Sequence, residues 1–328
     1  MSRRLWARAG LLGAAAVLAV LVWRLGTAPF LDGVRRIDGR SLAAAAGIAV
    51  LTTVCCAWRW KIVARGLGVD LSLGVAVAAY YRSLFLNTVL PGGVVGDVHR
   101  GVRHGRDVGD VRSGLRAVAW ERTAGQVVQG VLTVIALLAL PSPVRSSMPV
   151  VAAAVAALAL GVVLLVRVRP RGEPSRWART LRAARADVRD GLLARRAWPG
   201  IVLASAVVVA GHTVTFLIAA RTAGAAASLP RMLPLALLVL LAMVLPSVAG
   251  WGPREGVAAW AFSASGLGEA QGVATAVVYG VMVLVATLPG AGVLVVAWLH
   301  RRIRRTDPAD PPQWRVAATA GPDGAARG

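Results

Sequence analysis

The chain has 328 residues, of which 57% are hydrophobic, and its formal net charge is +22. Apolar runs of roughly 20 residues recur too often for a soluble core, so a soluble globular protein is excluded and an all-α polytopic membrane protein is predicted. The arginines lie in the gaps between apolar runs without interleaved aromatic residues, a placement that indicates membrane topology and argues against nucleic-acid binding.

Six apolar runs are long enough to span a bilayer as helices, with some tilt for the longer ones. In chain order they cover residues 9–23, 41–58, 117–140, 149–166, 200–220 and 272–299. The basic N-terminus resembles a signal peptide, but we interpret it as the interfacial anchor of an uncleaved first helix. The sequence therefore predicts about six spanning helices.

Two further apolar regions, residues 71–97 and 232–268, contain helix breakers and charges. The first is interrupted between Pro91 and Gly96, and the second by the sequence LPSVAGWGPREG at 245–256. Each region divides into arms of roughly 13–16 residues, which are short for a full span and typical of re-entrant elements. We therefore predict two broken re-entrant hairpins in addition to the spans.

The distribution of arginine indicates from which side each hairpin enters. With a cytoplasmic N-terminus and both hairpins returning to the side they left, the basic loops 100–116 and 167–198 are cytoplasmic, as are residues 301–305. If residues 71–97 were a full span, both basic loops would lie outside, against the positive-inside rule. The first hairpin is therefore predicted to enter from the cytoplasm and the second from the opposite side.

This topology makes the membrane domain, residues 1–305, an inverted repeat. Its halves, about 9–140 and 149–299, each consist of span, span, hairpin and span, but they begin on opposite sides. The basic segment 167–198 is predicted to be a cytoplasmic loop, and residues 306–328 a disordered cytoplasmic tail. The composition, with a single lysine, suggests a GC-rich bacterium and hence its inner membrane.

The two breaks also share a sequence pattern. Each contains Leu-Pro and a Gly-x-x-x-Gly, from Gly92 to Gly96 in the first and from Gly252 to Gly256 in the second. Each also carries an acid and a base. Inverted repeats whose broken helices meet near the membrane midplane are a signature of transporters.

Several ionisable residues lie at or near membrane depth beside these breaks. They are Asp97, Arg100, Glu121, Arg122, Arg254 and Glu255. Charges are costly at that depth and normally pair with one another or line a polar cavity. We favour a polar central site; the alternative is a set of interfacial charges that hold the helix register by salt bridges.

Such a site suits an anionic ligand. Broken helices expose backbone N–H groups that favour a phosphate, arginine supplements them with a planar fork of donors, and glycine allows a close approach. We expect the hairpins to bring Arg100 and Arg254 together at one phosphate, with the acids orienting them.

The sequence shows no enzyme constellation. It has no phosphate loop and no dinucleotide fingerprint, so coupling to ATP within this chain is not expected. Neither the pair Cys55 and Cys56 nor the four histidines show metal-ligand spacing. We predict no catalytic residue, no metal and no cofactor, and we predict that His212 is a hydrogen-bonding partner between helices.

The sequences YRSLFLNTVLPGGVVGDVHR, AWERTAGQ and LPSVAGWGPREG resemble the lysylphosphatidylglycerol synthase transmembrane-region family. This flippase-like membrane domain occurs alone or fused to an aminoacyl-lipid synthase, and the resemblance covers most of residues 10–300. The predicted substrate-binding site comprises Asn87, Gly92, Gly93, Gly96, Asp97, Arg100, Glu121, Arg122, Gly252, Arg254 and Glu255. On the match, all of these residues except Gly252 are motif positions of the family, together with Pro91 and Gly250.

The resemblance implies lipid translocation without aminoacyl transfer. The chain ends about 30 residues after its last span, so we expect a stand-alone membrane domain. The implied substrate is an anionic or aminoacylated phospholipid, or a glycolipid precursor. The expected partners are membrane phospholipid, anionic inner-leaflet lipid at the basic loops, and a separate lipid-modifying or glycosyl-transferring enzyme.

Two other functions remain open. One is an integral-membrane enzyme or accessory in polyprenyl-linked or lipid-linked glycan assembly, in which Asp97 or Glu255 could serve as the acid. The other is a non-transporting membrane scaffold for a separate lipid-modifying synthase. Scrambling of lipid without chemistry, product formation, or neither would separate the three.

Overall fold

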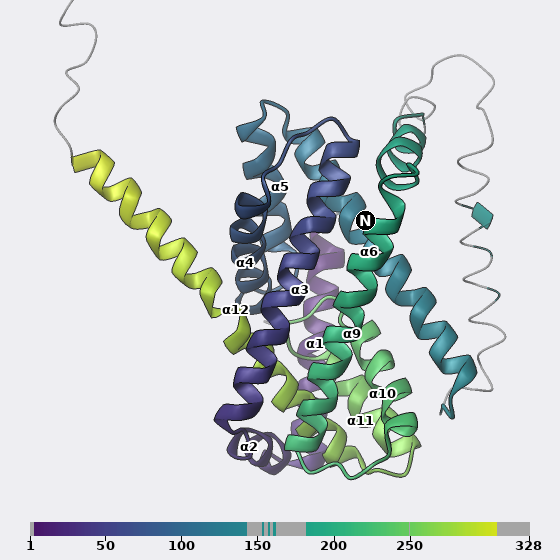
Figure 1. The fold of residues 1–328 in the computed structure, drawn as a ribbon. Coiled ribbons are helices and arrows are strands. Elements are labelled where there is room, and N and C mark those ends of the chain that lie inside the picture. The colour runs from purple at the N-terminus through teal and green to yellow at the C-terminus, as the bar shows by residue number, and fades with distance from the viewer. Residues whose placement is uncertain are drawn as a thin grey trace, which may run out of the picture.

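The computed structural model describes residues 3–142, 182–248 and 250–306, together with Ala153, Ala157, Leu160 and Gly161. Within these ranges the chain is helical, and most helices run alongside one another in one bundle (Figure 1). Most of the predicted span 149–166, residues 167–181 of the predicted loop 167–198 and the tail beyond Thr306 lie outside the described residues.

Helices are bounded by local capping and breaking residues. Residues 3–142 form α1 (Arg3–Leu25), α2 (Ala28–Arg35), α3 (Gly39–Gly66), α4 (Leu73–Val89), α5 (Val95–Asp107) and α6 (Val111–Ala139). The later residues form the π-helical turn η2 (Asp187–Leu192), α9 (Trp198–Thr222), α10 (Leu229–Ala242), α11 (Pro253–Ala264) and α12 (Glu269–Thr306). Asp38 and Asp110 cap α3 and α6 by accepting hydrogen bonds from backbone N–H groups of the first turn.

Four helical segments are long and apolar enough to cross a membrane. They are Gly39–Gly66, Val111–Ala139, Trp198–Thr222 and Glu269–His300. These segments correspond to four of the six predicted spans. Most of them extend past the predicted ends, because a helix stops at its cap or breaker and not where its apolar run stops.

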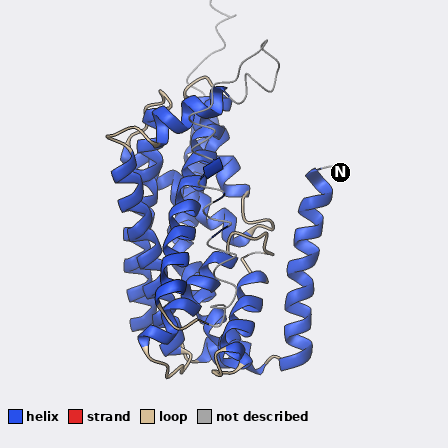
Figure 2. Cartoon of the chain, turned by 90° about the vertical axis from the view of Figure 1, so that its right-hand side faces the viewer, coloured by secondary structure: helices blue, strands red, loops and turns tan. Residues whose placement is uncertain are grey.

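The remaining predicted span on described residues, 9–23, lies within α1. The segment Leu12–Leu25 and α2 together are long and apolar enough for a fifth span, but they meet at a bend of 93°. Figure 2 shows α1, the helix that begins at the N-terminus, at the edge of the bundle. The described residues therefore hold four or five candidate spans, against about six predicted for the whole chain.

Both predicted breaks are present as helix–break–helix pairs. The first break, residues 90–94, separates α4 from α5, and the second break, residues 243–252, separates α10 from α11. The arms have 17 and 13 residues in the first pair and 14 and 12 in the second. Each arm is shorter than the roughly 20 residues that a span needs.

The two pairs enter the bundle from opposite ends (Figure 1). At the end where α4 begins, Asp187 of η2 accepts a hydrogen bond of 2.9 Å from Arg116 of α6. At the end where α10 begins, the carbonyl of Ala223 accepts hydrogen bonds from Arg36 (2.6 Å) and Gln271 (3.0 Å). The first contact places η2 and the start of α6 at one end of the bundle. The other two place the end of α2, the end of α9 and the start of α12 together at the opposite end.

The segment 100–116, which we predicted to be a loop, is mostly helix. α5 runs to Asp107, and α6 starts at Val111 after a short turn. A Cβ atom at Gly105 or Gly114 would run into the facing backbone, so glycine allows the two helices to pack closely. The density of charge suggested a loop, but Arg100 and other polar residues are buried on one face of α5.

Clusters of buried hydrophobic residues include both helices beside the second break and one helix, α4, beside the first. Phe216, Phe262 and Tyr279 are fully buried between α9, α11 and α12, with ring centroids 5.8–6.5 Å apart. A second cluster, around Trp60 and Tyr80, joins α3, α4 and α6. Buried apolar side chains therefore pack against at least one helix beside each break.

Candidate functional site

The two breaks contact each other inside the bundle. The backbone N–H of Gly92 in the first break donates a 3.0 Å hydrogen bond to the carbonyl of Ser247 in the second. Gly92 has a φ of 100°, a conformation that residues with a side chain rarely adopt. Segments far apart in the sequence thus meet through backbone that glycine makes possible.

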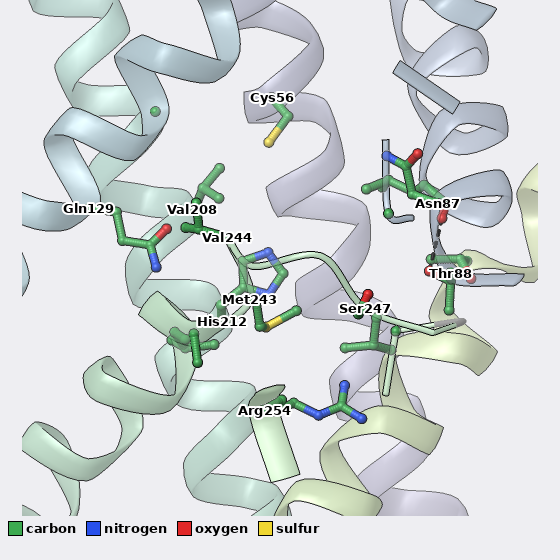
Figure 3. Close-up of a pocket in the computed structure, with 18 of the residues that line it drawn as sticks. Cys56, Asn87, Thr88, Gln129, Val208, His212, Met243, Val244, Ser247 and Arg254 are labelled. Carbon is green, nitrogen blue, oxygen red and sulfur yellow. Dashed lines mark hydrogen bonds between the residues drawn. The ribbon is translucent and has the colours of Figure 1, made fainter. Parts of the chain in front are cut away.

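A cavity of about 500 Å³ adjoins this contact (Figure 3). Residues of α3, α4, α6, α9, α10, α11, α12 and both breaks enclose it. Its charged lining consists of arginines: Arg59, Arg122 and Arg254. Its neutral polar lining comprises Tyr80, Asn87, Thr88, Gln126, Gln129, Ser205, His212, Ser247 and Thr287. Polar groups gathered around a cavity between membrane-length helices mark a candidate functional site.

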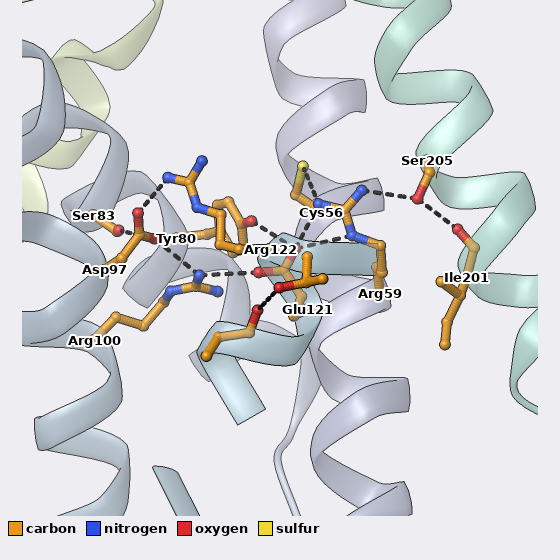
Figure 4. A network of polar contacts seen from close by, with 12 residues as sticks. Cys56, Arg59, Tyr80, Ser83, Asp97, Arg100, Glu121, Arg122, Ile201 and Ser205 are labelled. Atoms are coloured by element: carbon orange, nitrogen blue, oxygen red, sulfur yellow. Dashed lines mark hydrogen bonds and ion pairs between the residues drawn. The ribbon is translucent and has the colours of Figure 1, made fainter. Parts of the chain in front are cut away.

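Glu121 of α6 is the centre of a buried group of charges beside the cavity (Figure 4). Its side chain is fully buried and accepts hydrogen bonds from Arg59 (2.9 Å), Tyr80 (2.9 Å) and Arg100 (3.1 Å). These donors lie on α3, α4 and α5. One carboxylate therefore connects four helices around the first break.

Asp97, in the first turn of α5, is the second acid of this group. Its two oxygens accept hydrogen bonds from four side chains: Ser83, Asn87, Arg100 and Arg122. Asn87 also accepts a 2.7 Å hydrogen bond from the N–H of Gly96, which fastens the end of α4 to the start of α5. We define the first-break network as Arg59, Tyr80, Asp97, Arg100, Glu121 and Arg122.

Arg100 lies within the wall of the bundle and not at the cavity. Its guanidinium is 4.4 Å from the ring centroid of Trp60 and 4.1 Å from that of Tyr80, in cation–π geometry. It is absent from the described lining of the cavity. The structure therefore does not bring Arg100 and Arg254 together at one cavity, contrary to our expectation from the sequence, because the aromatic rings and acids of the first-break network hold Arg100 behind it.

The second break carries a simpler arrangement, which we define as the second-break pair, Arg254 and Glu255. The Nε of Arg254 donates a 2.9 Å hydrogen bond to one oxygen of Glu255. The other oxygen accepts a 2.7 Å hydrogen bond from the N–H of Gly252, at the start of α11. The Arg254 guanidinium lies 5.4 Å from the ring of Trp251 and 5.6 Å from that of Tyr279.

Glycines on facing helices make room for two of the lining arginines. A Cβ atom at Gly125 of α6 would lie 2.8 Å from the guanidinium of Arg59. A Cβ atom at Gly280 of α12 would overlap the guanidinium of Arg254. Both guanidinium groups therefore pack directly on the backbone of a neighbouring helix.

His212 of α9 lines the same cavity. Its Nδ1 is 3.0 Å from the hydroxyl of Tyr279 on α12, within hydrogen-bond distance. The predicted hydrogen bond between helices is confirmed. The part of the chain that the structure describes contains no group of three or more His, Cys, Asp or Glu residues that could hold a metal ion.

The eleven residues predicted from the sequence fall into two sets. Four line the cavity: Asn87, Gly93, Arg122 and Arg254. The others lie in or behind its walls: Gly92, Gly96, Asp97, Arg100, Glu121, Gly252 and Glu255. The second set holds the first in position.

The predicted use of free backbone N–H groups is not what the structure shows at Gly96 and Gly252. The N–H of Gly96 donates to Asn87, and that of Gly252 donates to Glu255. A side chain of the protein thus accepts one backbone N–H at each helix start. The arginines remain the principal donors that face the cavity.

The polar lining residues that the sequence interpretation missed include Arg59, Gln126 and Gln129. Arg59 directly follows the predicted span 41–58 and was therefore not among the predicted site residues, but it is buried in α3. Gln126 and Gln129 lie on the α6 face that meets the cavity. Two amides three residues apart in a span share one helix face, and this spacing was the available signal.

A protein-family comparison identifies the membrane region. Residues 8–307 match the family described as the lysylphosphatidylglycerol synthase TM region. No curated protein and no solved structure matches the chain. The match covers both breaks, all the cavity-lining residues and every candidate span. The chain is a multi-pass membrane protein that belongs to the lysylphosphatidylglycerol synthase transmembrane-region family.

Proposed function

We propose that this protein translocates a lipid with an anionic headgroup, and that the headgroup occupies the cavity between the two breaks. The observation that carries the proposal is an excess of positive charge in the two charged groups beside this cavity. The first-break network and the second-break pair together contain four arginines: Arg59, Arg100, Arg122 and Arg254. They contain three carboxylates: Asp97, Glu121 and Glu255.

An unbalanced charge inside a membrane protein is costly unless a counter-charge reaches it. Arg122 is placed to receive one, because 38% of its side chain is exposed although it also binds Asp97. Its Nε is buried and donates no hydrogen bond to any described residue. A phosphate in the cavity would supply both the charge and the acceptors, and the planar guanidinium fork matches phosphate oxygens.

The placement of the cavity supports movement across the membrane. Two broken pairs enter from opposite ends and meet at Gly92 and Ser247, beside the cavity. Rocking of one pair against the other would open the site to either side in turn, as in transporters built from inverted repeats. The two halves act in this proposal as such a repeat, with no covalent chemistry and no cofactor.

The proposed orientation follows from charge. The end of the bundle formed by the α5–α6 turn and η2 carries the basic segments and faces the cytoplasm of a bacterial inner membrane, with both termini on that side. Anionic inner-leaflet lipid would gather there. A separate lipid-modifying enzyme would supply or consume the translocated lipid.

The test is a scrambling assay with the purified full chain in liposomes. The liposomes contain phosphatidylglycerol with a fluorescent label on an acyl chain, and an impermeant reductant quenches the label in the outer leaflet. Protein-dependent loss of the protected inner-leaflet fluorescence reports translocation. We expect Arg122→Gln to lower the rate about tenfold or more and Arg122→Lys to restore part of it, because lysine offers a charge without a fork.

Arg112→Gln is the matched control. Arg112 lies on the same helix as Arg122 but is exposed in its first turn, so its loss should leave the rate unchanged. Chemical change of the lipid during the assay would favour the membrane-enzyme alternative. A folded protein that neither moves nor alters any lipid tested would favour the scaffold.

A further inference from the structure

The cavity lining discriminates between anionic and cationic headgroups. Among the described residues that line it, Arg59, Arg122 and Arg254 are charged, and there is no aspartate or glutamate. A headgroup that carries an ammonium would therefore meet three guanidinium groups at short range. Like charges in a poorly solvated site repel strongly.

The acids behind the lining offer no compensation. Both oxygens of Asp97 accept hydrogen bonds from two donors each. In Glu121, one oxygen accepts from Arg59 and Tyr80, and the other from Arg100. Each oxygen of Glu255 is likewise engaged. An ammonium could bind one of these carboxylates only by displacing a protein donor.

The neutral lining contains a vacant acceptor. The Oε1 of Gln126 on α6 is buried and accepts no hydrogen bond from any described residue. Gln129 faces the same cavity from the next turn of α6 (Figure 3). A carboxamide offers one acceptor and two donors, which is the set that pairs with a hydroxyl group. A buried acceptor left without a donor is destabilising, so a ligand hydroxyl is a suitable partner.

We infer that the headgroup is a phosphodiester with hydroxyl groups and without an amine, a polyol such as glycerol or a sugar. The arginines bind the phosphate, and Gln126 and Gln129 bind the polyol. This inference rests on the proposed function in placing a lipid headgroup in the cavity. It excludes aminoacylated lipids as the preferred substrates of this chain.

Binding is measured first, without transport. The purified full chain in detergent is titrated with phosphatidylglycerol, lysyl-phosphatidylglycerol and phosphatidylmethanol, and the bound lipid is counted by native mass spectrometry. We expect phosphatidylglycerol to bind at least about tenfold more tightly than the lysyl form, because the lysyl form brings ammonium groups to the arginines. Equal or tighter binding of the lysyl form would overturn the inference.

Two variants locate the selectivity. Gln126→Leu should reduce the preference for phosphatidylglycerol over phosphatidylmethanol, which has no headgroup hydroxyl, by roughly three- to tenfold, the effect of one hydrogen bond. Gln271→Leu is the control, since Gln271 binds the Ala223 carbonyl away from the cavity. Gln129→Glu should raise the relative affinity for the lysyl form. An unchanged preference in both lining variants would refute the assignment of the polyol to these glutamines.

Scrambling of the same lipids separates this inference from the proposed function. If phosphatidylglycerol binds selectively but nothing moves, the translocation proposal fails and the headgroup inference stands. If lipids move but the lysyl form moves as fast or faster, the headgroup inference fails and translocation stands. Neither binding nor movement would overturn both.

Discussion

The two breaks meet at one cavity but are supported in different ways. The first-break network spans α3, α4, α5 and α6, so that each of its acids binds side chains from several helices. The second-break pair consists of adjacent residues on α11, and Glu255 also caps that helix through Gly252. Support is therefore distributed around the first break and local at the second.

This difference indicates a division of labour. A charge removed from the first-break network leaves partners on other helices buried without a counter-charge, and such changes are strongly destabilising. The second-break pair can change its surroundings without disturbing that network, because the two share no hydrogen-bond partner among the described residues. The first break is suited to be the fixed side of the site and the second to be the moving side.

The largest effect is expected from Glu121→Gln. The change leaves Arg59 and Arg100 short of a buried carboxylate and should lower the free energy of unfolding by about 3–5 kcal/mol, measured by unfolding of the protein in detergent. Glu269→Gln is the control, because the Glu269 ion pair with Arg24 is partly exposed and 3.6 Å long, and it should cost at most about 1 kcal/mol. Similar losses in both variants would contradict distributed support at the first break.

The next largest effect is expected from Gly96→Ala. A Cβ atom at Gly96 would overlap the backbone of Ser83 on α4, so α4 and α5 would have to separate. Overpacking of this kind costs about 1–3 kcal/mol, again measured by unfolding. Gly130→Ala in α6, where nothing lies within 4 Å of the added atom, should be neutral or stabilising. Equal tolerance at the two positions would show that the first break does not depend on this close contact.

A smaller energy tests the independence of the breaks. Arg122→Gln and Arg254→Gln belong to different groups, so their effects on stability should add to within about 0.5 kcal/mol in the double variant. Both residues line one cavity, so either change alone should abolish most scrambling and the second should add little. Strong coupling in stability would show that the two breaks are one structural unit.

The smallest effect is expected at the surface turn between α5 and α6. Asp110 caps α6, and the hydrogen bonds from Ser113 lower the pKa of its carboxyl group. A lowered pKa in the folded state means that the stabilisation is complete above the ordinary value of about 4 and is lost as the pH falls through the lowered one.

Asp110→Ala should therefore lower the melting temperature slightly at neutral pH, and the difference from the natural protein should vanish in acid. Asp38 caps α3 in the same way at the other end of the bundle, and its pKa is likewise lowered by Ser41, so Asp38→Ala should follow the same pH profile. A difference that stays constant with pH would mean that the carboxylate charge has no part in the cap.

The sequence by itself determined the membrane class, the candidate spans on described residues and both breaks. The length of an apolar run is enough to make it a candidate span, whatever packs around it. Pro91, Gly92 and Gly252 interrupt a helix through their own backbone chemistry. The charges beside the breaks were identifiable for the same reason, since ionised groups at membrane depth are rare and costly.

Only the tertiary structure decided which charges face the cavity. Arg100 and Arg122 lie on neighbouring elements, yet Arg100 is stacked on Trp60 and Tyr80 within the wall while Arg122 is open to the cavity. Arg59 became a site residue only through Glu121, which is distant in the chain. Such assignments depend on how each helix is rotated and packed against the others, and that is fixed by contacts between segments that no local pattern records.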